Sequence, residues 1–372
     1  MSVIHPLRMP KWGLSMKEGT VTRWWKGENA PLAIGDDLVD IETSKITNLY
    51  ESPVAGTLRR VLAKEGETLP VGALIGVVAD AAVSDAEIDM FVVDFQAQSA
   101  ASGAEEGAGA GFAFARIEID GRTIRIGRMD GPAGKVPILL IHGFAGDLNS
   151  WLFNIEALAA SGPVIALDLP GHGESSKDVA DGSLPFLAET VAQLLATLEI
   201  GTAHVIGHSM GAAVAARLAA DRPRLVSSLS LICPALLPGT ALAESFLTGL
   251  VEFGRARDLK PCLEMLFANP ALVTKEMAED MAKYKRIDGV EEALGVLRDR
   301  LVSGADAAAL IADLPKIRTA LVILGRQDQI VGAPDPAALP PGFTLSWIDG
   351  AGHMPHLEQS AEVNALLAAQ LR

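Results

Sequence analysis

The segment Gly207-His208-Ser209-Met210-Gly211 decides the fold of the larger part of this chain. It follows a strand-like run at 203–206 and precedes an alanine-rich, helix-forming run at 212–220. A strand, a tight turn and a helix in this order present the central serine above the edge of a sheet, provided that small residues flank it. Glycine stands at both flanking positions, so the pattern predicts that Ser209 is a nucleophile on such a turn.

The sequence on both sides of this turn alternates between apolar strand segments and helical segments. Two alternating runs, at 116–119 and 122–128, predict an antiparallel entry hairpin. Continuous apolar runs, typical of strands buried on both faces, follow at 136–141, 164–167, 229–233, 320–324 and 344–348. Helical runs such as 184–198 and 212–220 separate the strands. Residues 116–372 are therefore predicted to form an α/β domain with a mostly parallel sheet.

An acid and a histidine follow the serine in the order that a nucleophilic triad requires. Asp328 comes just after the strand at 320–324, and His353 follows the next strand. Strand ends on one edge of a parallel sheet bring such residues together despite their separation in sequence. A neutral His353 can accept the Ser209 proton, while Asp328 fixes the imidazole tautomer and stabilises the imidazolium.

A further segment, His142-Gly143-Phe144, ends an earlier strand and completes the motif set. The backbone N–H groups of Phe144 and Met210 are the predicted oxyanion hole, which stabilises charge on an attacked carbonyl. Over residues 116–372 these motifs resemble the α/β-hydrolase family. The resemblance implies a helical cap over the site at about 235–315.

Structural roles are expected for other histidines near these motifs and for Cys233. His208 is the variable residue of the turn and is expected to point away from the chemistry. His172 lies in a Pro-Gly-His-Gly loop that is taken as structural. His353 and His356 have HxxH spacing without an acidic or cysteine companion nearby in sequence, so no metal site is expected. Cys233 ends an apolar strand and is expected to be buried packing.

Composition limits the remaining possibilities. The 372 residues carry a formal net charge of −15, which argues against nucleic acid and anionic membrane surfaces as partners. Only two cysteines are present, so a disulfide framework is excluded and a reducing compartment is expected. No signal peptide and no membrane-spanning run is recognised. We expect a cytoplasmic protein.

Residues 1–80 form short β segments broken by Gly, Pro and Asp, which predict a separate all-β domain. A faint repeat relates 19–23 to 56–60 and 37–41 to 73–77, which indicates a flattened sandwich of two similar halves. Between the halves, alternating apolar residues (Val39 and Ile41) precede a polar segment, and apolar residues (Ile46 and Leu49) follow it. This pattern predicts a hairpin with Lys45 at or near its turn.

The residues around that lysine resemble a lipoyl domain. The segments 9–19, 42–45 and 52–56 match its first strand and turn, its lipoylation turn and the strand that follows. Biotin carriers share the fold but place methionines beside their lysine, where this chain has Ser44 and Ile46. The resemblance therefore implies lipoate in amide linkage on Lys45.

The segment 81–115 differs from both flanking parts, with six acidic residues and no basic one. Ser84-Asp85-Ala86-Glu87 has capping-box spacing and precedes an apolar face at positions 88, 91, 92 and 95, which predicts a short helix. That face is expected to pack on one of the two domains; a docking helix for a partner subunit is the alternative. Of the 19 residues 97–115, 14 are Ala, Gly or Ser, which predicts a flexible tether.

The combination of a lipoyl domain and a hydrolase-type domain resembles, over the whole chain, the dihydrolipoyl acetyltransferase components of acetoin dehydrogenase complexes. The resemblance implies acetyl transfer from the lipoyl arm to coenzyme A. It also implies two partners, a thiamine-diphosphate enzyme that cleaves acetoin and a dihydrolipoyl dehydrogenase, with a homo-oligomeric assembly expected. A tether of 15–20 residues gives an r.m.s. reach of roughly 20–27 Å.

The chain departs from acyltransferases of the 2-oxoacid dehydrogenase complexes, because it lacks their C-terminal His-x-x-x-Asp-Gly motif. Acetyl transfer would therefore use Ser209 in a ping-pong route. A serine hydrolase or thioesterase that releases acetate, with the lipoyl domain as its delivery arm, is the main alternative. A scaffold without catalysis is a third, and the complete triad counts against it. Candidates for binding coenzyme A are Arg255, Arg257 and Lys260 in the cap.

Overall fold

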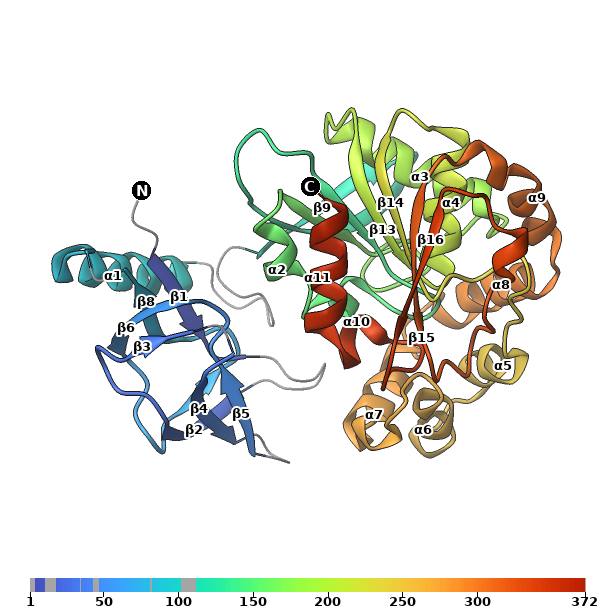
Figure 1. The fold of residues 1–372 in the computed structure, drawn as a ribbon. Coiled ribbons are helices and arrows are strands. Elements are labelled where there is room, and N and C mark those ends of the chain that lie inside the picture. The colour runs from blue at the N-terminus through green and yellow to red at the C-terminus, as the bar shows by residue number, and fades with distance from the viewer. Residues whose placement is uncertain are drawn as a thin grey trace. The chain divides into compact units, whose positions relative to one another are not determined.

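The computed structural model describes residues 4–10, 18–33, 35–42, 47–80, 82–101 and 112–371. The chain divides into two compact units, Met1–Phe112 and Ala113–Arg372 (Figure 1). The first unit holds a β domain followed by one helix and precedes a larger α/β unit, as the sequence predicts.

The first unit consists of two four-stranded antiparallel sheets, in the strand orders β1-β8-β6-β3 and β5-β4-β2-β7. Its strands are β1 (Ile4–Arg8), β2 (Glu18–Trp24), β3 (Pro31–Leu32), β4 (Asp37–Glu42), β5 (Thr47–Glu51), β6 (Gly56–Val61), β7 (Thr68–Pro70) and β8 (Leu74–Ala79). The repeat seen in the sequence relates β2 to β6 and β4 to β8, and each pair contributes one strand to each sheet. Apolar side chains from both sheets form the core, among them Leu7, Val21, Leu38, Ile41, Leu58 and Ile75.

The strands β4 and β5 form the hairpin expected around the lysine. They pair antiparallel up to Glu42 opposite Thr47, which leaves four residues to connect them. Lys45 is one of those four and lies outside the described residues.

The helix expected after the first domain is α1 (Asp85–Ala101). Glu87 accepts from the Ser84 backbone N–H at 2.9 Å, and the Ser84 hydroxyl accepts from the Glu87 N–H at 3.3 Å, which is the capping box that the sequence predicts. The buried side chains of Ile88 and Phe95 pack with apolar residues of β8 in the same unit. The prediction that the apolar face of this helix packs on one of the two domains is therefore confirmed.

Basic side chains of β6 fix the first turns of α1. The Arg59 guanidinium lies 3.0 Å from the Asp85 carboxylate, and Arg60 lies 2.8 Å from Asp89. The helix is longer than its sequence pattern predicts and reaches Ala101, since alanine has the highest helix propensity. With β9 beginning at Phe112, the segment between the two elements is 102–111, shorter than the expected tether at 97–115.

The second unit is built on one eight-stranded sheet in the order β16-β15-β14-β13-β11-β12-β10-β9. Its strands are β9 (Phe112–Ile119), β10 (Arg122–Met129), β11 (Ile138–Ile141), β12 (Val164–Leu167), β13 (Ala203–His208), β14 (Val226–Ile232), β15 (Ala320–Gly325) and β16 (Phe343–Ile348). The strands from β12 to β16 pair in parallel, and β10 pairs antiparallel with β12. The entry hairpin and the mostly parallel sheet are confirmed.

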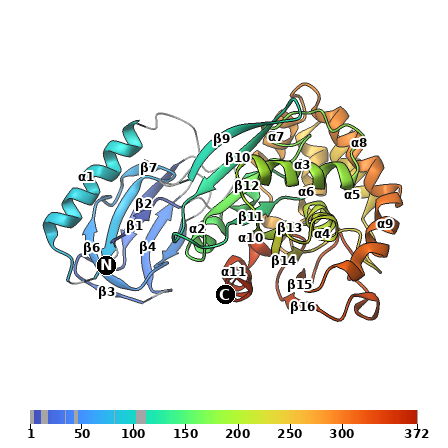
Figure 2. The ribbon, with the colours of Figure 1, turned by 90° about the horizontal axis from the view of Figure 1, so that it is seen from above.

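Helices cover this sheet on both faces (Figure 1, Figure 2). They are α2 (Ile155–Ala159), α3 (Leu184–Thr197), α4 (Met210–Asp221), α5 (Glu244–Glu252), α6 (Ala256–Glu264), α7 (Lys275–Tyr284), α8 (Val290–Val302), α9 (Ala305–Asp313), α10 (Pro355–Glu358) and α11 (Ser360–Gln370), with short 3-10 helices at Leu148–Trp151, Pro270–Leu272, Leu314–Lys316 and Pro336–Ala338. The helices α2 and α11 pack together, as do α3 and α4. The helices α5 to α9 fall inside the segment 235–315, where a helical cap is expected. No described helix is long and apolar enough to cross a membrane.

Candidate active site

The nucleophile turn has the strained backbone that its sequence requires. Ser209 has φ 53° and ψ −116°, and it begins α4 without using its hydroxyl to cap the helix. A Cβ on Gly207 would overlap the carbonyl oxygen of Gly211, and a Cβ on Gly211 would overlap that of His142. Both positions therefore need glycine because backbone approaches them closely. The Ser209 side chain is left free to react, although the residue is only 6 % exposed.

The acid and the histidine meet at the edge of the sheet where the parallel strands end. Asp328 follows β15 and His353 follows β16, and the His353 Nδ1–H donates to Asp328 Oδ2 at 2.8 Å. The other carboxylate oxygen accepts from the backbone N–H groups of Ile330 at 2.8 Å and Val331 at 3.0 Å. Burial alone would raise the pKa of Asp328, but His353 and these two donors lower it overall. The carboxylate thus stays charged and fixes the tautomer of His353.

The loop after β11 lies against the start of α4, as the predicted oxyanion hole requires. A Cβ on Gly143 would lie 3.0 Å from the Ser209 Cβ. Within the part of the chain that the structure describes, neither the Phe144 N–H nor the Met210 N–H donates to a protein acceptor. Both donors are therefore available to a substrate oxygen.

A buried network holds this loop in place. His142 Nε2 accepts from the Leu169 N–H at 3.0 Å, and its Nδ1–H donates to the Gly143 carbonyl at 2.7 Å. The buried Asp168 carboxylate accepts from the Leu148 N–H at 2.8 Å. His172 lies beside the same loop, with its ring centroid 4.9 Å from that of His142. These contacts agree with the structural role expected for the Pro-Gly-His-Gly loop.

The expectation that His208 points away from the chemistry is wrong. Its Nε2–H donates to the backbone carbonyl of His353 at 2.8 Å, and the two ring centroids lie 4.7 Å apart. The position before the nucleophile lies at the end of β13, and the loop after β16 passes directly over it. The sequence carries no signal for this contact, because His208 and His353 are 145 positions apart.

Cys233 is buried, as expected, but it also lies closer to the site than the sequence indicates. Its Sγ accepts from the Gly325 N–H at 3.4 Å, and it lies within 4.8 Å of the ligand atoms of Asp328 and His353. Burial, together with the Asp328 charge, raises the pKa of the Cys233 thiol well above its ordinary value. It is therefore a protonated thiol and a poor nucleophile.

The segment between α6 and α7 is tied to the His353 loop. The His353 N–H donates to the Leu266 carbonyl at 2.8 Å. The Glu358 carboxylate accepts from the Gly352 N–H at 2.6 Å and from the Ala268 N–H at 2.7 Å. This part of the predicted cap is therefore in direct contact with the backbone that presents the candidate base.

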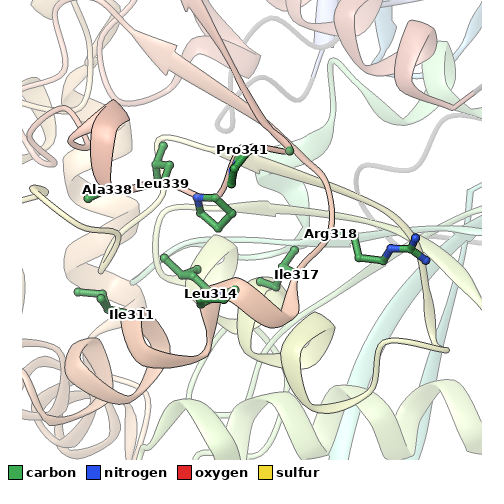
Figure 3. Close-up of a pocket in the computed structure, with 10 residues that line it drawn as sticks. Ile311, Leu314, Ile317, Arg318, Ala338, Leu339 and Pro341 are labelled. Atoms are coloured by element: carbon green, nitrogen blue, oxygen red, sulfur yellow. The ribbon is translucent and has the colours of Figure 1, made fainter.

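A cavity of about 480 Å³ opens elsewhere on the α/β unit (Figure 3). It is lined by side chains that include Ile311, Leu314, Ile317, Arg318 and Leu339. These residues precede β15 and β16, whereas the candidate acid and base follow the same two strands. The cavity thus lies at the opposite edge of the sheet and contains none of the candidate site residues.

Comparison with known proteins agrees with the two units. Residues 138–366 match the family model of the alpha/beta hydrolase family, and residues 5–78 match the biotin/lipoyl model described as biotin-requiring enzyme. The α/β unit superimposes on 2-hydroxy-6-oxo-6-phenylhexa-2,4-dienoate hydrolase from Rhodococcus with a TM-score of 0.62 at 21 % identity, covering 70 % of this chain and 99 % of that one. At this identity the likeness concerns the fold alone.

Two relatives match the chain from end to end. The dihydrolipoyllysine-residue acetyltransferase component of the acetoin cleaving system of Cupriavidus necator is 45 % identical, over 99 % of this chain and 97 % of its own length. The protein of the same description from Pseudomonas putida is 46 % identical over the whole of both chains. The chain therefore belongs to the family of dihydrolipoyllysine-residue acetyltransferase components of acetoin cleaving systems, with an α/β-hydrolase domain in its second unit.

Proposed function

We propose that this protein transfers an acetyl group from a dihydrolipoyl arm on Lys45 to coenzyme A within an acetoin cleaving system, and that Ser209 carries the acetyl group between them. The observation that carries the proposal is the Asp328–His353 hydrogen bond at the same sheet edge as the strained Ser209. End-to-end similarity to two acetyltransferase components supports the choice of reaction.

The β4–β5 hairpin and the sequence of its connection support lipoate as the group carried by the first unit. Because β4 and β5 pair as far as Glu42 and Thr47, Lys45 is one of the four residues that connect these two strands. Ser44 and Ile46 flank Lys45 in place of methionines, which favours lipoate over biotin. When attached, the group supplies a thiol that holds acetyl as a thioester.

In the first half-reaction, Ser209 Oγ attacks the thioester carbonyl while the His353 imidazole takes the hydroxyl proton. The Phe144 and Met210 N–H groups stabilise the charge on the carbonyl oxygen. The C–S bond then breaks, and the imidazolium returns the proton to the leaving thiolate. The products are an acetyl ester on Ser209 and a free dithiol.

In the second half-reaction, His353 takes the proton of the coenzyme A thiol, and the sulfur attacks the ester of Ser209. Collapse of the tetrahedral intermediate breaks the C–O bond, and the proton passes from His353 back to Ser209 Oγ. Water must be excluded during the life of the ester. The burial of Ser209 and His353 and the contacts of Leu266 and Ala268 with the His353 loop support that role for the cap.

The basic candidates for coenzyme A differ in their surroundings. The Arg257 Nε lies 3.4 Å from Asp258, and Lys260 pairs with Glu264, so part of their charge is already neutralised. Arg255 is exposed at the start of α6, and no ion pair involves it among the residues that the structure describes. We therefore assign Arg255 the largest share in binding the phosphates of coenzyme A.

The proposed reaction needs two partners. A thiamine-diphosphate enzyme that cleaves acetoin would load acetyl onto the arm, and a dihydrolipoyl dehydrogenase would reoxidise the dithiol. Residues 1–372 contain no His-x-x-x-Asp-Gly motif, so the proposed transfer uses Ser209 in place of the mechanism of other lipoyl-linked acyltransferases.

The deciding experiment follows the acetyl group in a single turnover. Lipoylated, acetylated full-length protein is mixed with coenzyme A or with buffer alone, and intact mass and acetyl-CoA are measured over time. Loss of acetyl only with coenzyme A, accompanied by stoichiometric acetyl-CoA, supports the transferase. Equal loss as acetate without coenzyme A would make the protein a hydrolase with a delivery arm.

The control is the Ser209→Ala variant, which should keep the acetyl group on the arm under both conditions. Undiminished acetyl-CoA formation by this variant would refute the role of Ser209. Retention of acetyl by the lipoylated protein without the substitution, with coenzyme A present, would place the chemistry on another subunit.

A further inference from the structure

His208 contacts the three segments that form the candidate site. It belongs to the nucleophile turn, its Nε2–H donates to the His353 carbonyl at 2.8 Å, and a Cβ on Gly143 would lie 2.8 Å from its Nδ1. Its ring lies 4.7 Å from that of His353 and 4.6 Å from that of His356. One buried side chain thus touches the nucleophile turn, the oxyanion loop and the histidine loop.

The state of this imidazole excludes a proton-transfer role. Burial, and then the neighbouring His356 and His353 rings, lower the pKa of His208 well below its ordinary value. The ring is therefore neutral, and donation to the His353 carbonyl places its proton on Nε2. His208 is neither an acid nor a second base, and its hydrogen bond to the main chain is what it contributes.

We propose that His208 is a positioning residue that holds the main chain at His353, so that the imidazole stays aligned between Asp328 and Ser209. The inference rests on the proposed function of these three residues. His208 directly precedes Ser209 in the chain, so the bond joins nucleophile and base through one intervening peptide unit. Asp328 orients the His353 ring, whereas His208 fixes the backbone from which that ring projects.

The expected effect is large because alignment errors are costly. A displacement of about 1 Å at a reacting group lowers the rate by roughly 100-fold. The bond joins two groups of the protein itself, so we expect its loss to lower kcat and to leave KM nearly unchanged. A residue that merely fills space would be replaced equally well by any side chain of similar volume.

Three substitutions separate positioning from packing. His208→Gln keeps an amide donor near the place of Nε2, His208→Asn retracts the donor, and His208→Leu removes it at similar volume. Each is made in the lipoylated full-length protein, and acetyl-CoA formation is measured with acetylated dihydrolipoamide and coenzyme A. His204→Gln is the matched control, since His204 lies on the same strand and its ring bonds to Ser228 Oγ, at 2.7 Å, away from the candidate site.

We expect His208→Leu and His208→Asn to lower kcat by roughly 10- to 100-fold with KM within twofold, and His208→Gln to stay within about threefold of the unsubstituted protein. The His204→Gln control should be unchanged. If His208→Leu does not fold, the comparison of Gln with Asn decides the question. Equal activity of the Gln and Asn variants, or a His208→Leu variant with unchanged kcat, would overturn the proposal.

A second readout is the low-field proton resonance of the His353 Nδ1–H bonded to Asp328. It should persist in His208→Gln and broaden or disappear in His208→Leu. Ser209→Ala is measured in parallel: if it remains active, the proposed chemistry fails regardless of His208. If it is inactive while every His208 variant is fully active, only the positioning role is refuted.

Discussion

The imidazole of His353 and the carboxylate of Asp328 form a 2.8 Å hydrogen bond, and both side chains are almost completely buried. A carboxylate buried in this way would be destabilised if it stood alone. The backbone donors of Ile330 and Val331 share its charge, so it can hold the imidazole without becoming neutral. The predictions below follow from this arrangement and from the packing around it.

Asp328→Asn should lower acetyl transfer by roughly 10⁴-fold with little change in fold, because an amide stabilises the wrong tautomer of His353. Transfer rates and the far-ultraviolet circular dichroism spectrum check this. Asp349→Asn, at an exposed position where the carboxylate pairs with Arg326, is the control and should transfer acetyl normally. An Asp328→Asn variant with normal rates would remove Asp328 from the site.

Gly211→Ala should destabilise the α/β unit by about 2 kcal/mol or more and abolish transfer, because the added methyl overlaps the His142 carbonyl oxygen. Gly201→Ala adds the same methyl where no atom lies within 4 Å, and it should change the free energy of unfolding by less than about 0.5 kcal/mol. Chemical denaturation of both variants tests the difference. Equal stability of the two would contradict the close approach at the turn.

His356 makes the stability of the protein depend on pH. Burial lowers the pKa of His356 to about 3, whereas the unfolded chain binds a proton near pH 6.5. The stability that this neutral ring contributes is complete above pH 6.5 and is lost as pH falls toward 3, by at most about 1.4 kcal/mol per pH unit.

We therefore expect the free energy of unfolding of His356→Leu to fall less steeply with decreasing pH than that of the unsubstituted protein. Denaturant titrations between pH 4 and pH 7 measure this slope. The pKa values of His142, His172 and His208 are also lowered by burial, so a weaker acid dependence remains in the variant. Identical slopes for the two proteins would show that His356 is protonated in the folded state.

Alanine substitutions distinguish the face of α1 that packs on β8 from the outer face of the same helix. Ile88 is fully buried and Met90 is 62 % exposed on the same helix. Ile88→Ala should destabilise the first unit by about 2–4 kcal/mol, and Met90→Ala by less than about 0.5 kcal/mol. Thermal denaturation of the lipoyl unit within the full chain checks this. Comparable effects would mean that the helix packs through another face.

Lys45→Gln should abolish lipoylation and with it acetyl-CoA formation by the assembled complex. The same variant should still transfer acetyl from free acetylated dihydrolipoamide, since the second unit is untouched. Lys64→Gln, at an exposed position in the same unit, is the control and should be lipoylated normally. Intact mass detects the modification, and a Lys45→Gln protein that still gains the lipoyl mass would place the attachment elsewhere.

Much of this architecture could be predicted from the sequence, because it rests on local signals. The glycines at 207 and 211, the continuous apolar strands and the capping box at Ser84 each impose a backbone conformation through neighbours in the chain. Since parallel strands end at one edge, the order of these signals was also enough to predict that Asp328 and His353 would meet.

The sequence by itself determined the candidate residues for the proposed chemistry, while the tertiary structure alone decided what surrounds them. The bond from His208 to the His353 carbonyl joins residues 145 positions apart, and the contact of Cys233 with Gly325 spans 92. Neither has a periodicity or a spacing that marks it. Such contacts depend on the path of loops over the sheet edge, which is set by packing of the whole unit and not by any local preference of the chain.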